Sequence, residues 1–168
     1  VFSYMPNAPE LEGTLLRDIA GRRGHSNGEV LLELLLEQNL KVGYLAEPPE
    51  SQAVWNQLGR DFMELLARDD YMVCSDITPA GNHPHPRCFG AFPRFLGRLR
   101  REVGNLTLEA MIHRMTDRPA RRFGLTHRGR IEKGWFADLV VFDDAKVNDT
   151  ATYREPKQFP LGIPYVLV

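Results

Sequence analysis

An acid, two histidines and an arginine follow one another closely in the stretch YMVCSDITPAGNHPHPRCFGAFPRFLG, which runs from Tyr71 to Gly97. The acid is Asp76, which lies just past the short apolar run YMVC. In parallel α/β folds, side chains at the carboxyl ends of strands project into the catalytic opening. Asp76 therefore has the position of a catalytic carboxylate, although an aspartate in this context also commonly caps a turn or a helix.

The two histidines, His83 and His85, alternate with prolines. A His-X-His spacing on a strand points both rings to the same side, as metal binding requires. Pro84 and Pro86 interrupt any strand ladder here, so the stretch is predicted to be an extended loop. The pair could bind a metal, but the prolines favour a role in ordering the loop through hydrogen bonds.

Arg87 follows this stiff stretch, which should hold its guanidinium in one direction. A guanidinium presented in this way can bind a carboxylate through two parallel hydrogen bonds. The alternative role for Arg87 is a salt bridge between loops.

Helix-like and strand-like patterns alternate in the first half of the chain. The predicted elements are a helix ending at Gly24, a helix over 27–38, a strand over 40–45, a helix over about 54–66 and a buried strand over 71–74. The apolar face expected of the third helix consists of Val54, Leu58, Phe62, Leu65 and Leu66. Alternation of this kind is typical of parallel α/β architecture.

The second half of the chain has a different pattern. One helix is predicted around Phe92–Val103, and Thr107 is expected to cap another that runs to Met115. After Gly124 short β segments are broken by glycine and proline, in GRIEKGWFADLVVF and PLGIPYVLV. These segments predict part of a small β domain.

The composition limits the class of protein without identifying it. A chain of 168 residues with 43% hydrophobic residues can bury a core, and its formal net charge of −1 favours neither a nucleic-acid nor a membrane partner. No apolar run reaches the roughly 18 residues of a membrane span. Cys74 and Cys88 form no disulfide framework, which suits a reducing cytosol, and both are predicted to be packing residues rather than nucleophiles.

The segment from Arg94 to Arg130 is locally basic, with ten arginines against three acidic residues. Such a surface could bind nucleic acid. No aromatic stacking platform accompanies the arginines, so solvated helix faces or ion pairs with acids elsewhere are favoured.

Several of these motifs together resemble one family. MVCSD, the following HPHPRCFGAFPRFLG and the later GWFADLVVFD are similar to the C-terminal part of the N-acyl-D-amino-acid deacylases, or D-aminoacylases, of the metal-dependent amidohydrolase superfamily. The resemblance covers nearly the whole chain and is strongest over residues 72–168. Both ends of the chain read as internal sequence, which predicts a piece of a longer protein.

The resemblance implies an α/β fold: the C-terminal part of a (β/α)8 TIM-type barrel and part of a small β-sandwich. Residues 1–124 would belong to the barrel and residues 125–168 to the sandwich. Leu40–Leu45 would be the seventh barrel strand and Tyr71–Cys74 the eighth.

The resemblance also implies an activity, which is zinc-dependent hydrolysis of the amide bond of N-acyl-D-amino acids. Asp76 would be the proton shuttle beside the metal, near a second metal where one binds. Arg87 would hold the carboxylate of the substrate, and His85 would also belong to the substrate site. The zinc ligands would lie mostly upstream of Val1. Ile77, where the family usually has glycine, leaves the particular substrate open.

Other functions remain open at this point. The chain could belong to another amidohydrolase, hydantoinase-like or dihydroorotase-like, or be a non-catalytic barrel remnant that serves in assembly or binds nucleic acid. The expected partners are a small-molecule substrate and the remainder of the same polypeptide or another chain, with no membrane or nucleic acid. The expected location is cytoplasmic, and the isolated 168-residue piece is expected to be inactive.

Overall fold

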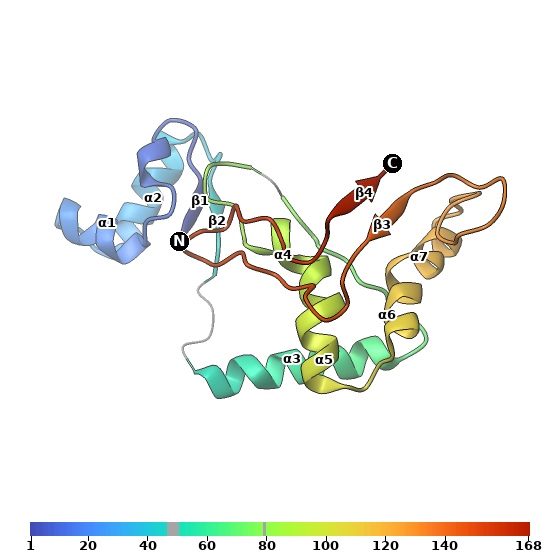
Figure 1. Cartoon of the computed structure of the whole chain (residues 1–168). Helices are drawn as coiled ribbons and strands as arrows, with labels where there is room; N and C mark the ends of the chain where they lie inside the picture. The colour runs from blue at the N-terminus through green and yellow to red at the C-terminus, as the bar shows by residue number, and fades with distance from the viewer. Residues whose placement is uncertain (47–50, 79) are drawn as a thin grey trace. The chain divides into compact units, whose positions relative to one another are not determined.

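Segments that are far apart in the sequence come together in each of two units of the chain (Figure 1). The structure is a computed structural model that describes residues 1–46, 51–78 and 80–168. The first unit contains Val1–Pro48, Ile77–Cys88 and Thr152–Lys157. The second unit contains Pro49–Asp76, Phe89–Ala151 and Gln158–Val168. The division between residues 124 and 125 expected for the complete protein stays a prediction.

Two helices cover a small antiparallel sheet in the first unit. The elements are β1 (Phe2–Tyr4), the 3-10 helix η1 (Pro9–Leu11), α1 (Leu16–Arg23), α2 (Asn27–Glu37) and β2 (Gly43–Tyr44). Helix α1 ends at Gly24, whose positive φ of 71° suits glycine. Helix α2 begins with a capping box between Ser26 and Glu29. The core of this unit consists of Phe2, Met5, Ile19, Ala20, Val30 and Leu34.

The second unit is mainly helical. Its elements are α3 (Gln52–Ala67), a continuous helical stretch made of α4 (Arg87–Pro93), the π-helical η2 (Arg94–Leu99) and α5 (Arg100–Val103), then α6 (Leu108–Met115), α7 (Asp117–Arg122), β3 (Leu139–Val141) and β4 (Tyr165–Leu167). The first two residues of α4 belong to the first unit. The buried core consists of Met63, Leu66, Val73, Leu96, Leu99, Met111 and Val147. Among the described residues, no helix is both long enough and apolar enough to span a membrane.

The predicted helices are confirmed, since α1, α2, α3 and α6 occur where the apolar periodicity placed them. The side chain of Thr107 caps α6 by accepting a hydrogen bond from the Ala110 N–H at 3.2 Å. The β segments predicted after Gly124 are also confirmed, because β3 and β4 pair antiparallel.

The strand predictions in the first half are largely wrong. Residues 71–74 form no strand, and the N–H of Val73 donates instead to the carbonyl of Arg114 in α6 at 3.3 Å. Within residues 40–45 only β2 forms a strand, and it pairs antiparallel with β1. The positive φ of Leu40, 63°, is incompatible with a strand that begins there. A strand exists only beside another extended segment, and in the described part of the chain every sheet is an antiparallel pair.

The buried face of α3 also differs from the prediction. Met63 is fully buried and Leu66 is 4% exposed, whereas four of the five residues predicted for the inner face are at least a third exposed: Val54, Leu58, Phe62 and Leu65. The periodicity therefore identified the helix correctly but assigned most of its buried side incorrectly.

In the second unit the backbone of η2 packs closely against the backbone at Val147. A Cβ atom at Gly97, in η2, would overlap the carbonyl oxygen of Val147. The same carbonyl accepts a hydrogen bond from Arg101 Nη2 at 2.9 Å, so it cannot move without losing that bond. Only glycine allows η2 to pack at this distance.

We expect Gly97→Ala to destabilise the complete protein by about 3 kcal/mol, because the methyl group must displace a bonded backbone. Gly21→Ala in α1 is the matched control, since nothing lies within 4 Å of its added Cβ. That control should stabilise by roughly 0.5–1 kcal/mol through helix propensity. Urea unfolding of both variants measures the difference, and equal effects at the two glycines would contradict the packing described here.

Candidate functional site

Both histidines of the loop bind the same residue, Tyr153, within the first unit. His83 Nε2 lies 2.7 Å from the backbone carbonyl oxygen of Tyr153. His85 Nε2 lies 3.0 Å from the hydroxyl of Tyr153, and the two rings form an edge-to-face contact with their centroids 5.1 Å apart. The histidines therefore order the loop through hydrogen bonds, as the prolines of the motif favoured.

His85 also caps the first turn of α4. Its Nδ1 accepts a hydrogen bond from the Arg87 N–H at 3.0 Å, and its carbonyl accepts one from the Cys88 N–H at 2.9 Å. A cap accepts from backbone N–H groups that the helix leaves unpaired, and proline is favoured at the first helical position because it has no N–H. His85 therefore caps the helix and Pro86 follows it. Arg87 then begins α4 with an exposed guanidinium.

The beginning of the loop is attached to the first strand region. The carboxylate of Glu12 accepts hydrogen bonds from the N–H of Met5 at 2.7 Å and from the N–H of Asn82. Gly81, with a φ of 80°, passes so close to Ser3 that a Cβ would overlap the Ser3 carbonyl. The loop is thus held at Asn82, His83 and His85.

Asp76 belongs to the second unit, whereas the histidine loop and Tyr153 belong to the first. It is exposed and has a positive φ of 45°, a conformation that aspartate tolerates better than most residues. Its N–H lies 3.4 Å from Cys74 Sγ, which makes a weak hydrogen bond across the turn. Cys74 is exposed, so its predicted packing role is wrong, and Cys88 is half-buried.

Tyr153 and Glu12 are the members of this group that sequence analysis missed. Each lies about 70 positions along the chain from its partner in the loop, as the separations for Tyr153 with His83 and Glu12 with Asn82 show. No local motif marks either residue. In the stretches 1–46, 51–78 and 80–168, no three His, Cys, Asp or Glu side chains gather closely enough to hold a metal ion.

The arginines of the basic segment are mostly engaged within the second unit. Arg94 pairs with Asp149 at 3.2 Å, and Arg98 pairs with Glu102 at 2.9 Å. Other engaged arginines bind carboxylates or backbone carbonyls: Arg100, Arg101, Arg114, Arg118, Arg121, Arg128 and Arg130. This confirms the interpretation of the segment as ion-paired helix faces.

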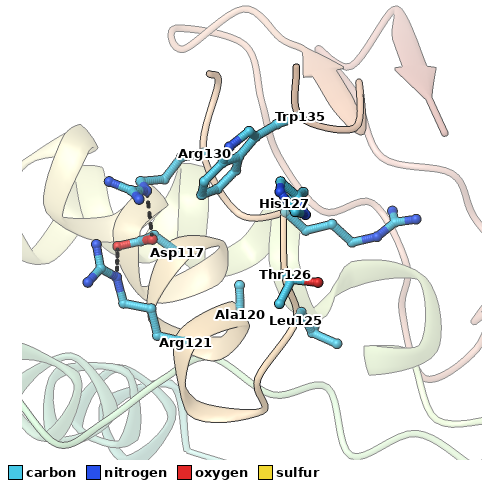
Figure 2. A pocket seen from close by; sticks show the side chains of 9 residues that line it. Asp117, Ala120, Arg121, Leu125, Thr126, His127, Arg130 and Trp135 are labelled. Carbon is cyan, nitrogen blue, oxygen red and sulfur yellow. Dashed lines mark hydrogen bonds and ion pairs between the residues drawn. The ribbon is translucent and has the colours of Figure 1, made fainter. Parts of the chain in front are cut away.

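A cavity of about 350 Å³ lies beside α7 in the second unit (Figure 2). At its edge the buried carboxylate of Asp117 binds Arg121 Nε at 2.8 Å and Arg130 Nε at 3.1 Å. The guanidinium of Arg130 lies 5.0 Å from the ring centroid of Trp135. These contacts hold the segment after α7 against the helix, and none of the predicted site residues lines this cavity.

Comparison with known proteins gives matches to the amidohydrolase family and to several deacylases. A sequence profile of the amidohydrolase family matches residues 51–168. The chain is 39% identical over all 168 residues to D-aminoacylase from Alcaligenes xylosoxydans xylosoxydans, of which it covers 32%. It is 53% identical over 97 residues to N-acyl-D-glutamate deacylase from the same organism, which is 58% of this chain and 20% of that protein.

Solved structures give the same result. The structure of N-acyl-D-glutamate deacylase from Bordetella bronchiseptica, in complex with zinc and a phosphonate inhibitor, matches with a TM-score of 0.79 and 36% identity. That match covers 99% of this chain and 32% of the other. A crystal structure of D-aminoacylase matches with a TM-score of 0.78 and 35% identity, over 100% of this chain and 33% of the other. The chain thus spans about a third of the length of these relatives.

The site makes one prediction for pH. Burial lowers the pKa of the His85 imidazole below its ordinary value of 6.5, and the positive charge of Arg87 lowers it further. Between the lowered pKa and 6.5 the unfolded chain binds more protons than the folded chain, so stability rises with pH across this window and is lost as pH falls through it. A histidine NMR titration of the complete protein should give a His85 pKa below 6.5, and Arg87→Gln should raise it. A value at or above 6.5 in the unmodified protein would contradict the described environment.

Proposed function

Because this chain belongs to the amidohydrolase family, we propose that the complete protein is a zinc-dependent hydrolase of the amide bond of N-acyl-D-amino acids. The observation that carries the proposal is the 39% identity to a D-aminoacylase over the entire chain. The deacylases for N-acyl-D-glutamate and N-acyl-D-aspartate are also similar, so the shared part of their substrates, an acylated D-amino acid, is the class we assign.

The architecture proposed for the complete protein is a TIM-type barrel with a β-sandwich. Residues 1–124 would supply the C-terminal part of the barrel, and residues 125–168 part of the sandwich. In this arrangement Asp76, in the segment between α3 and α4, would lie at the face where catalytic side chains gather. The antiparallel pair of β3 and β4 would belong to the sandwich.

Asp76 is the residue to which we assign proton transfer. Amide hydrolysis requires a base that removes a proton from the attacking water and an acid that delivers a proton to the leaving nitrogen. A carboxylate can do both in turn, and the exposed position of Asp76 leaves it accessible to substrate. The described residues do not fit a zinc ion by themselves, since no three ligand side chains gather among them. The zinc ligands would lie upstream of Val1, and zinc would polarise the amide carbonyl.

Arg87 is the residue to which we assign binding of the α-carboxylate. It is exposed, begins α4 and follows a proline-rich loop that is held at three points. A fixed guanidinium binds a carboxylate with two charge-assisted hydrogen bonds and so orients the scissile amide. His85 would contribute to the substrate site by setting the position of Arg87.

Replacing Asp76 with asparagine should reduce turnover of N-acyl-D-amino acids by about 10²–10⁴-fold, because the amide cannot transfer the proton. Circular dichroism and zinc content should not change. Asp70→Asn is the matched control, since Asp70 is an exposed carboxylate that pairs with Arg68 at 3.2 Å on the surface. Turnover close to that of the unmodified protein in Asp76→Asn would reject the assigned role.

Replacing Arg87 with alanine should raise KM for carboxylate-bearing substrates by about 10- to 100-fold, the loss expected for hydrogen bonds between charged groups. N-acyl amines without a carboxylate should be hydrolysed as before. Arg17→Ala, at an exposed arginine of α1, controls for loss of surface charge. An equal loss on charged and uncharged substrates would be incompatible with carboxylate binding.

A further inference from the structure

We propose that Tyr153 is a positioning residue for Arg87, because its hydroxyl holds the His85 ring in the orientation that caps the helix on which Arg87 lies. The proposal rests on the function assigned to Arg87 above. It adds a residue outside the loop and outside the motifs of the sequence analysis. Tyr153 lies 68 positions from His85 in the chain, within the same unit.

The hydrogen bond from the backbone decides the tautomer of His85. The Arg87 N–H is a donor and lies 3.0 Å from His85 Nδ1, so Nδ1 must carry a lone pair rather than a proton. A neutral imidazole then has its proton on Nε2, which lies 3.0 Å from the Tyr153 hydroxyl oxygen. In this tautomer the hydroxyl oxygen accepts from Nε2–H, so the ring bonds both Arg87 and Tyr153.

The other tautomer breaks the contact with Arg87, although the Tyr153 hydroxyl could then donate to Nε2. With the proton on Nδ1, two N–H groups would face each other at 3.0 Å, and the first turn of α4 would lose its cap. Protonation of both nitrogens has the same consequence at Nδ1. Lowering of the His85 pKa by burial and by Arg87 supports the neutral ring in this environment.

The attachment through His83 makes Tyr153 unusually suitable for a substitution experiment. The carbonyl of Tyr153 accepts from His83 Nε2 at 2.7 Å whatever side chain residue 153 carries. Phenylalanine at this position also keeps the edge-to-face ring contact with His85. Tyr153→Phe therefore removes the acceptor for His85 Nε2 and leaves the backbone attachment and the aromatic packing in place.

In the complete protein, Tyr153→Phe should raise KM for an N-acetyl-D-amino acid by about 3- to 10-fold, the loss expected for one neutral hydrogen bond. The value of kcat should change less than KM, because the hydroxyl does not touch the reacting atoms. Hydrolysis of an N-acetyl amine without a carboxylate should be unchanged. In an Arg87→Ala background, Tyr153→Phe should have no further effect on KM.

Tyr44→Phe is the matched control in the same unit. It also removes one hydroxyl and keeps the edge-to-face contact with Phe2, whose centroid lies 6.3 Å away. It should leave KM unchanged. A rise in KM on Tyr153→Phe that persists in the Arg87→Ala background, or that appears equally for Tyr44→Phe, would overturn the positioning role.

The tautomer can be measured directly in the unmodified protein. Selective ¹⁵N labelling of histidine with long-range ¹H–¹⁵N correlation should show His85 protonated at Nε2 and not at Nδ1. A proton at Nδ1 would overturn the proposal even if the Tyr153 variant failed to fold. The two proposals fail in different ways: if Arg87→Ala raises KM and Tyr153→Phe does not, only the positioning role fails. If Arg87→Ala itself has no carboxylate-dependent effect, the assigned function of Arg87 fails.

Discussion

The prolines of the histidine loop impose the constraint on which the rest of the site depends. Pro84 and Pro86 have no N–H, so the loop cannot be held by a ladder of backbone hydrogen bonds. Its position must be set by side chains, and the two histidines that alternate with the prolines do this by binding the carbonyl and the hydroxyl of Tyr153. A stiff segment with fixed φ angles then needs few attachments, because little conformational entropy remains to be lost.

The segment over residues 152–157 is therefore as much a part of the candidate site as the loop itself. In the sequence this segment follows β3, whereas the loop precedes α4. Both nevertheless belong to the first unit. Glu12 makes a comparable connection from the other end of the sequence by accepting hydrogen bonds from the N–H groups of Met5 and Asn82. The loop itself, the segment around Glu12 and the segment 152–157 thus together determine the position of Arg87 at the start of α4.

Sequence analysis predicted those features whose physical cause is local. Helix α2 could be located because its apolar spacing lies within about three turns of helix. The strand predicted over 71–74 failed because a strand depends on a neighbour, and there Val73 binds a helix carbonyl instead. The same difference applies to the site. The acid, the histidines and the arginine are adjacent in sequence, whereas the contacts of Glu12 and Tyr153 span about 70 residues and leave no periodic or motif signal.

The exposed side of α3 and the exposed residue Asp76 present the same physical problem. An apolar stripe such as that of Val54, Leu58 and Phe62 stabilises a protein only when it is covered, and a carboxylate binds zinc only together with further ligands. Among the described residues Phe62 packs edge to face on Phe95 but the stripe stays at least a third exposed, and no three metal ligands gather. The chain spans 32% of the length of a similar D-aminoacylase. The proposed barrel meets both requirements together, because the strands that would carry the metal ligands would be accompanied by helices that can pack against α3. On this proposal the apolar periodicity of α3 would reflect its packing in the complete protein, and that packing would bury the face that the described part of the chain leaves exposed.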